Sequence, residues 1–167
     1  MAGTLTLHGL DVLDARGWSF DDGMALEVFT VVPLFDRTVK WDAVTSDVRR
    51  ALAGELELEA RVTDRARAYG LRRVRAARPE QTSVRIDDNA SAVATVIDVR
   101  AADRIGTLYR ITRVLAECGL DVRHAKISSI GHEVVDAFYV VDGDGRKLTW
   151  QQGAQVRDAI LDELSRH

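Results

Sequence analysis

One short polar turn in this 167-residue sequence combines residue types that suit the binding of a small charged molecule. Asp103-Arg-Ile-Gly106 comes directly before a segment with helical periodicity, so the first backbone N–H groups of that helix point toward the turn. These groups and the helix dipole favour an anion such as an amino-acid carboxylate. Because it lacks a side chain, Gly106 lets a ligand approach the backbone closely. The sequence predicts a ligand site at Asp103, Arg104, Ile105 and Gly106.

Two further aspartates belong to the same hypothesis. The ligand's amino group would meet either Asp103 or Asp121, and Asp11 is the counterpart of Asp121 in an internal repeat. A purely structural interpretation of the turn stays open, in which Asp103 caps the helix and Gly106 eases a tight bend. The predicted ligand-binding residues are therefore Asp103, Arg104, Ile105, Gly106, Asp121 and Asp11.

The repeat relates the two halves of the chain. Gly9-Leu-Asp-Val12 recurs as Gly119-Leu-Asp-Val122, and after one extra residue Phe29-Thr-Val-Val32 aligns with Phe138-Tyr-Val-Val141. The second copy has a strand-like segment and most of a helix before its Gly119, whereas the first copy has only eight residues there. We expect a partial module followed by a nearly complete one, in a piece of a longer protein.

The second copy predicts the order strand, helix, strand, strand, helix. Its expected elements are a strand at 91–100, a turn at 101–106, a helix ending at Gly119, strands at 121–129 and 133–141 joined at 130–132, and a helix that a Thr149–Gln152 capping box begins. One more strand would complete the ferredoxin-like βαββαβ pattern. The expected fold class is therefore α+β, with helices on one face of an antiparallel sheet.

The first copy predicts the same order of elements, but without the first strand and most of the first helix. Its expected elements are a helix tail at 2–8, hairpin strands at 11–19 and 24–32, a helix capped by Asp42, and a continued or restarted helix through 56–69. The short alternating run Ser83–Asp87 is either the fourth strand of the first module or an edge strand of the second. We assign residues 1–69 to the partial module, 70–82 to a linker and 83–167 to the second module.

The missing first strand has a physical consequence. In a sheet of order 4-1-3-2 the first strand is central, so the strand at 24–32 would keep a bare hydrogen-bonding edge. Such an edge invites pairing with another chain. We therefore expect a homodimer or a swapped strand.

Both copies resemble a known family. The stretch from Asp103 to Leu108, followed by a helix and by Gly119–Ile127, resembles the ACT domain, a βαββαβ regulatory module that commonly binds amino acids. Ile105 stands where that family most often has proline. The run Val135-Asp-Ala-Phe-Tyr-Val140 and the earlier Asp22-Gly-Met-Ala-Leu-Glu-Val-Phe29 are similar to the last two ACT domains of bifunctional PII uridylyltransferase/uridylyl-removing enzymes.

The resemblance implies a role in nitrogen regulation. In that family one catalytic domain adds uridylyl groups to a PII signalling protein, another removes them, and the C-terminal ACT pair senses glutamine. The partners that the resemblance implies are an amino acid, with glutamine as the expected one, and the catalytic domains of the parent enzyme. This chain shows neither catalytic pattern, so we expect it to be catalytically silent alone and to need no cofactor.

Two rival functions remain open at this stage. An ACT pair can serve only in dimerisation or domain docking, and it can also be the regulatory tail of another amino-acid-controlled enzyme. The substitution of isoleucine for proline in the turn and the missing first strand favour the docking role. An arginine-rich tract through 61–78 is either a dock for an acidic partner or a solvated helix face and linker.

The composition narrows the classes of partner. A net charge of -3 argues against a nucleic-acid binder, and no apolar run is long enough to span a bilayer. The single cysteine, Cys118, suits a reducing compartment, so we expect a cytoplasmic protein without membrane contact. The four histidines lack metal-ligand spacing, and we expect no metal site.

Overall fold

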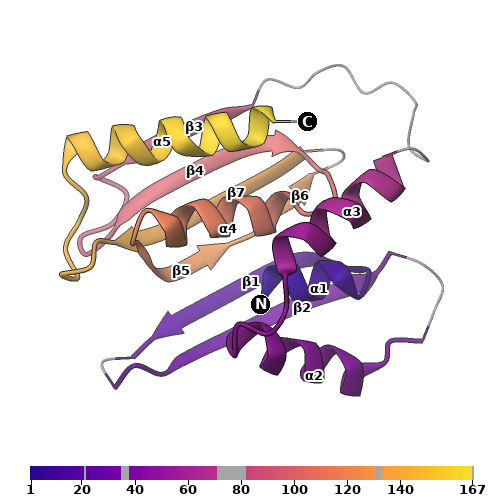
Figure 1. Ribbon diagram of the computed structural model, residues 1–167. Coiled ribbons are helices and arrows are strands. Elements are labelled where there is room, and N and C mark those ends of the chain that lie inside the picture. The colour runs from indigo at the N-terminus through magenta and orange to yellow at the C-terminus, as the bar shows by residue number, and fades with distance from the viewer. Residues whose placement is uncertain (21, 35–37, 71–81, 131–132, 167) are drawn as a thin grey trace.

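The computed structural model describes residues 1–20, 22–34, 38–70, 82–130 and 133–166 and has two antiparallel sheets with helices, which confirms the α+β class (Figure 1). The first module contains α1 (Ala2–Leu7), β1 (Leu10–Ser19), β2 (Ala25–Pro33), α2 (Trp41–Leu52) and α3 (Leu58–Gly70). The second contains β3 (Ser83–Asp87), β4 (Thr95–Ala102), α4 (Thr107–Glu117), β5 (Asp121–Lys126), β6 (Ser129–Ile130), β7 (Glu133–Val141) and α5 (Trp150–Ser165).

The sheet of the second module has the strand order β3-β4-β7-β5, and β6 also pairs with β7. β3 pairs antiparallel with β4, from Ser83 opposite Arg100 to Asp87 opposite Val96. Of the two alternatives for this strand, the structure shows the edge strand of the second sheet. Gly153 of α5 allows the helix to approach β3 closely, since a Cβ there would lie 3.2 Å from Cγ2 of Ile86.

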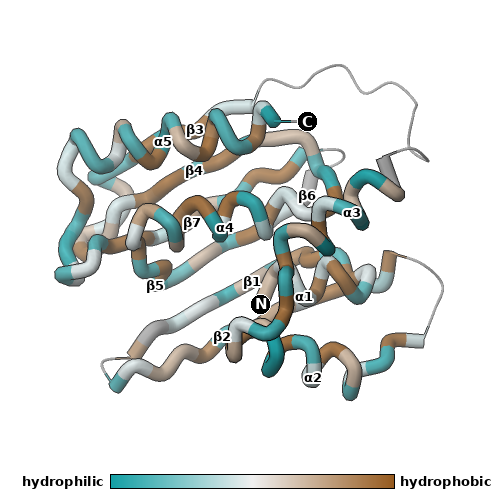
Figure 2. The backbone as a smooth tube through the Cα atoms, in the orientation of Figure 1, coloured by the Kyte–Doolittle hydropathy of each residue, from teal (hydrophilic) through white to brown (hydrophobic). Residues whose placement is uncertain are grey.

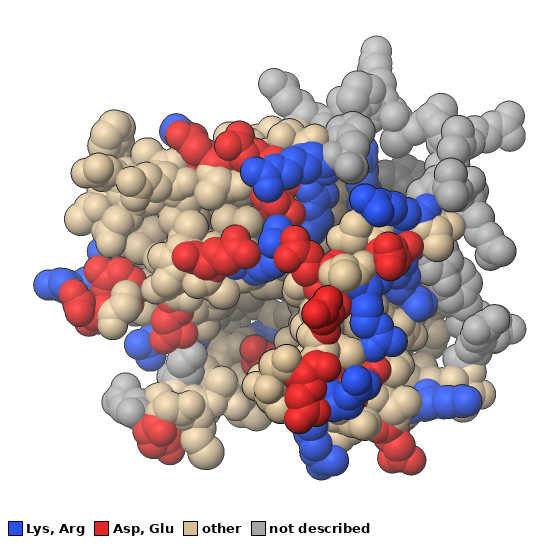
Figure 3. Space-filling view, in the orientation of Figure 1, with Lys and Arg blue, Asp and Glu red and all other residues tan. Residues whose placement is uncertain are grey.

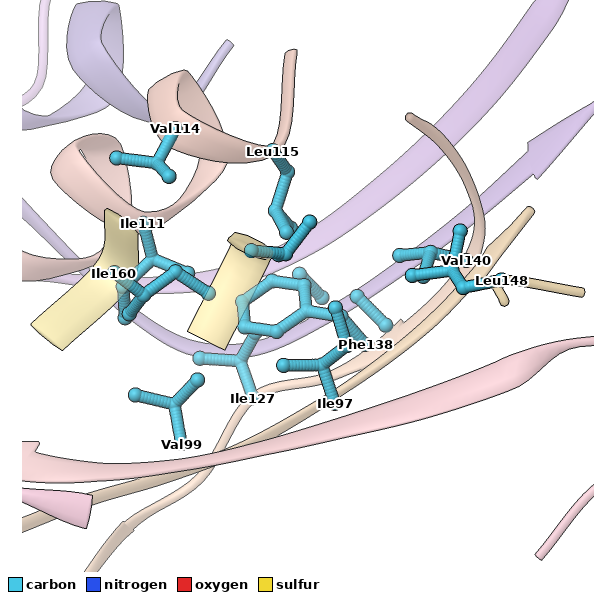
Figure 4. Packing of buried hydrophobic residues seen from close by; sticks show 13 residues of the cluster. Ile97, Val99, Ile111, Val114, Leu115, Ile127, Phe138, Val140, Leu148 and Ile160 are labelled. Atoms are coloured by element: carbon cyan, nitrogen blue, oxygen red, sulfur yellow. The ribbon is translucent and has the colours of Figure 1, made fainter. Parts of the chain in front are cut away.

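The hydrophobic core lies between this sheet and the helices α4 and α5. Figure 4 shows the ring of Phe138 surrounded by aliphatic side chains from β4, α4 and α5. Its fully buried members include Ile97, Ile111, Leu115 and Ile160. Alternation along β4 and β7 places the buried side chains of these two strands, among them Ile97 and Phe138, on one face of the sheet, as the sequence predicts.

The first module has a smaller core. Leu5 of α1, Leu10 of β1 and Val44 of α2 form it, with Phe29 and Val31 of β2 packed against them. Among the described residues β2 pairs only with β1. Its other edge therefore has no ladder within the described part of the chain, in agreement with the bare edge expected there.

The two modules share packing along neighbouring strands. β1 runs beside β5, and Ala15 of β1 is buried in the same cluster as Phe138 and Ala125 of the second module (Figure 1). At the helical layer α1 lies against α4, where a Cβ on Gly3 would come 2.7 Å from Cδ2 of Tyr109. Only a residue without a side chain fits between the helices at this distance, so the first module packs tightly on the second.

A cluster of ion pairs joins α3, α4 and α5. Glu163 of α5 is nine-tenths buried and lies 3.1 Å from Nε of Arg110 and 2.9 Å from a terminal nitrogen of Arg113. Arg113 also lies 2.9 Å from the carboxylate of Glu59 in α3. Figure 3 shows acidic and basic side chains gathered over these helices. Burial alone would raise the pKa of Glu163, but the hydrogen bond from Arg110 and the charge of Arg113 lower it.

We predict that Glu163→Gln lowers the free energy of unfolding by about 2 kcal/mol at pH 7, because two arginines lose a buried charged partner. Glu59→Gln is the matched control, because its carboxylate is exposed and should contribute about 0.5 kcal/mol. Since the pKa of Glu163 is lowered in the folded state, its contribution should vanish as the pH falls below about 4.5. Urea unfolding from pH 3 to 7 measures both effects, and equal losses in the two variants would contradict the assignment.

Several local predictions need correction. Asp42 does not cap α2, because the helix begins one residue earlier and Lys40 is its N-cap, without a side-chain bond. The strand expected at 121–129 is interrupted between β5 and β6, and β4 extends through Ala102, so the turn is shorter than expected. The helix through 56–69 restarts as α3 rather than continuing α2. The capping box of Thr149 and Gln152 is confirmed.

Some predictions fall on residues that the structure does not describe. Most of the predicted linker and residues 131–132 of the predicted hairpin tip lie outside the described residues. The part of the arginine-rich tract after α3 does so as well. No helix within the described ranges is long and apolar enough to cross a membrane.

Candidate functional site

The turn singled out in the sequence opens on a cavity of about 80 Å³ between the two modules. This volume holds several water molecules or a small polar group. Its polar and turn-forming lining comprises Asp103, Arg104, Ile105 and Gly106 from the turn, Asp11 from β1 and Asp136 from β7. The cavity thus brings together five of the six residues predicted to bind a ligand, and Asp136 is the one acidic residue of its lining that was not predicted.

The turn presents the start of α4 to this cavity. Gly106 is the N-cap of α4, with a φ of 87°, a conformation that residues with a Cβ adopt rarely. A Cβ at this position would also lie 2.9 Å from Cγ1 of Val62, so α3 covers the turn. No side chain forms a cap hydrogen bond at α4, and Asp103 therefore does not have the capping role of the structural interpretation. The helix N-terminus keeps its capacity to bind an anion.

Through Asp11 the first module contributes an acidic residue to the lining of the cavity. It lies near the start of β1, opposite Val32 of β2, and lines the cavity together with the turn of the second module. A ligand in this position would contact both modules at once.

Asp121 is not part of this cavity. It begins β5 opposite Val141, and its carboxylate lies 3.0 Å from Nε of Arg123. The repeat made Asp11 and Asp121 equivalent in sequence, but the structure places only Asp11 beside the Asp103–Gly106 turn. A ligand-binding role for Asp121 outside this cavity stays a prediction.

Asp136 is the cavity residue that sequence reasoning missed. It lies in the middle of β7 and is 1% exposed, in a row that otherwise contains Val134, Phe138 and Val140. One carboxylate oxygen accepts a hydrogen bond from the backbone N–H of Ser128 at 3.3 Å, and the other has no hydrogen-bond partner among the described residues. A charged residue in an alternating apolar strand was the signal that could have identified it, because an unsatisfied buried carboxylate is costly.

The surroundings of Asp136 change its acidity. Its pKa is raised to about 7, chiefly by burial and also by the nearby charge of Asp103, while the hydrogen bond from Ser128 acts in the opposite direction. The folded protein therefore holds a proton on Asp136 at pH values where an unfolded chain would have released it.

We predict a specific pH dependence for the Asp136→Asn variant. Because the pKa is raised from 3.8 to about 7 on folding, the wild type loses stability as the pH rises between these values. The variant lacks this titration, so its stability relative to the wild type should increase over that interval, by on the order of a few kcal/mol. Chemical unfolding of both proteins from pH 4 to 8 measures the difference. Parallel stability curves would show that Asp136 does not titrate in this way.

The charged groups of the cavity suit the binding of a small molecule. Within the described part of the chain no group of three or more His, Cys, Asp or Glu side chains is placed to hold a metal ion. The cavity offers carboxylates, one guanidinium group and a helix N-terminus, which together match a small molecule that carries both a positive and a negative charge.

Comparison with known proteins agrees with the fold. Residues 90–161 match the family model described as the ACR family N-terminal ACT domain. This match and the ferredoxin-like sheet confirm the resemblance to the ACT domain. No solved structure matches the chain.

Curated relatives extend the similarity to nearly the whole chain. The chain is 37% identical, over 99% of its length, to a protein of Azospirillum brasilense named bifunctional uridylyltransferase/uridylyl-removing enzyme. Proteins of the same name in Rhodospirillum rubrum and Streptomyces coelicolor are 34% and 35% identical over 96% and 98% of the chain. The similarity to these enzymes is thereby confirmed, although the chain spans only 17% to 20% of the length of these three relatives.

Proposed function

We propose that this chain is an amino-acid-sensing regulatory region of a bifunctional uridylyltransferase/uridylyl-removing enzyme that acts on a PII protein, and that its ligand is glutamine. The observation that carries the proposal is the cavity between Asp11 of the first module and the Asp103–Gly106 turn of the second. The name of the relatives supports the identity of the parent enzyme. Both of its catalytic activities would reside outside this chain, in the cytoplasm.

The shared cavity explains how binding would regulate. The α4 N-terminus would bind the ligand's carboxylate, and the carboxylates that line the cavity would bind its amino group. Because the lining comes from both modules, the ligand binds best when β1 and the turn keep their observed separation. A ligand shifts an equilibrium only through such a difference in affinity between two arrangements.

We predict that L-glutamine stabilises the protein. At 100 times its dissociation constant the free energy of unfolding should rise by about 2.7 kcal/mol. For a protein of this size the thermal midpoint should then rise by roughly 5–10 °C. A thermal-shift screen of the twenty amino acids, followed by calorimetry, measures the effect and ranks the ligands.

The two equivalent aspartates provide a matched pair of variants. Asp11→Asn should weaken glutamine binding by about tenfold, because it removes a charged group from the cavity lining. Asp121→Asn should leave the affinity unchanged, because that residue does not line the cavity. Equal losses in both variants would contradict the proposed site, and a flat amino-acid screen would contradict the sensing function.

A second candidate function, self-association, rests on a different surface. The apolar side chains of Leu26, Val28 and Val32 on β2 are 51%, 48% and 39% exposed, beside the edge that has no ladder among the described residues. Figure 2 shows apolar stretches along the backbone of β2. An apolar face next to an open edge favours pairing of strands from two chains. The surface would therefore support a homodimer, with or without a ligand in the cavity.

We predict that Val28→Lys weakens self-association, because a lysine on an edge strand opposes pairing with another strand. Val93→Lys is the control, since Val93 is 77% exposed and lies outside both sheets. Light scattering after size-exclusion chromatography at micromolar concentration measures the mass. A wild type that is monomeric, or variants that dissociate equally, would contradict the dimer.

A further inference from the structure

The proposed function does not specify which carboxylate of the cavity binds the amino group of the ligand. The helix N-terminus accounts for the binding of an anion, and Asp11 accounts for the contribution of the first module. Asp136 lies deeper than both, on the strand that forms the floor of the core, and one of its oxygens has no hydrogen-bond partner within the described residues. Such an oxygen is expected where a ligand group completes the set of hydrogen bonds.

The internal repeat shows that the buried position is specific to this site. The repeat aligns Glu27 of β2 with Asp136 of β7, but Glu27 is exposed. The common fold therefore does not require a buried acid at this place in the strand. It is the second module, whose turn faces the cavity, that buries one.

The charges around Asp136 favour a cation beside it. Asp103 and Arg104 of the turn and Asp11 of β1 line the same cavity as Asp136, and the charge of Asp103 acts on it. α4 and the segment between β5 and β6 contribute only Thr107, Leu108 and Ile127 to the lining, and none of these titrates. Even while Asp136 holds its proton, the two carboxylates of Asp11 and Asp103 outnumber the guanidinium group of Arg104, and a ligand ammonium group would reduce this excess of negative charge.

We propose that Asp136 recognises a primary ammonium group of the ligand, through the carboxylate oxygen that lacks a partner, and that binding releases the proton held by this carboxyl. The inference rests on the proposed function, since it concerns the same cavity. It adds the residue that distinguishes an amino acid from an analogue without its amino group. It also makes the affinity depend on pH.

The direction of the pH effect follows from the charges. At pH values below about 7 the carboxyl of Asp136 holds a proton, because of its burial and the charge of Asp103. The ammonium group of a ligand favours the ionised form, so binding displaces this proton into solution. Affinity should therefore rise as the pH rises toward 7 and stay level above it.

Calorimetry on the 167-residue chain tests the inference with L-glutamine and with 4-carbamoylbutanoate, which is glutamine without its amino group. The wild type should prefer glutamine by about tenfold or more, and Asp136→Asn should remove this preference by weakening glutamine alone. Glu27→Gln, the exposed counterpart in the repeat, should behave as the wild type. Heats in two buffers of different ionisation enthalpy should show proton release at pH 6.5 and none at pH 8.5.

The outcomes separate the inference from the proposed function. If the wild type binds glutamine and Asp136→Asn binds it equally well, the inference is wrong and the sensing function stands. If the cavity binds simple primary amines but no amino acid, and the variant loses them, the sensing function is wrong and the inference stands. Binding of no amine overturns both. Should the variant fail to fold, the absence of proton release by the wild type at pH 6.5 would overturn the inference by itself.

Discussion

The contact between β1 and β5 is the interaction on which the rest of this structure depends. It brings Ala15 of the first module into the core that contains Phe138 of the second, so the two modules bury apolar surface together. Without this contact the first module would consist of a two-stranded sheet and short helices, which is marginal on its own. The same contact sets the distance between Asp11 and the Asp103–Gly106 turn, and therefore creates the cavity.

The edge strand beside β4 in the second module comes before the other strands of that module in the chain. The ferredoxin-like pattern places the last strand after the second helix, but here β3 precedes the first strand of the module and occupies the edge beside β4. The antiparallel pairing with β4 and the packing of Ile86 on Gly153 of α5 satisfy the same geometric need. Position in space, rather than order along the chain, decides which strand covers this edge.

The elements with a strong local signal could be predicted from the sequence. The alternation in β4 and β7, the glycine that ends α4 and the capping box at Thr149 all depend on neighbouring residues. For β3 the sequence left two partners open, one of which the structure shows. The separation of Asp11 from Asp121 could not be predicted, because it depends on how the modules pack. Asp136 could have been noticed from its place in the apolar row of β7, but its position in the same cavity as the turn also depends on packing.

The cavity also connects the ligand site to the end of the first module. Val62 of α3 lies so close to Gly106 that the turn cannot accept even a methyl group without displacing it. Glu59, one turn earlier in α3, is paired with Arg113 of α4, so the same helix is held to the second module by charge and by packing. A change in the turn on ligand binding therefore acts on α3 directly. α3 ends at Gly70, where the segment between the two modules begins. The arrangement of the two modules relative to each other is therefore the property that such a change would alter most.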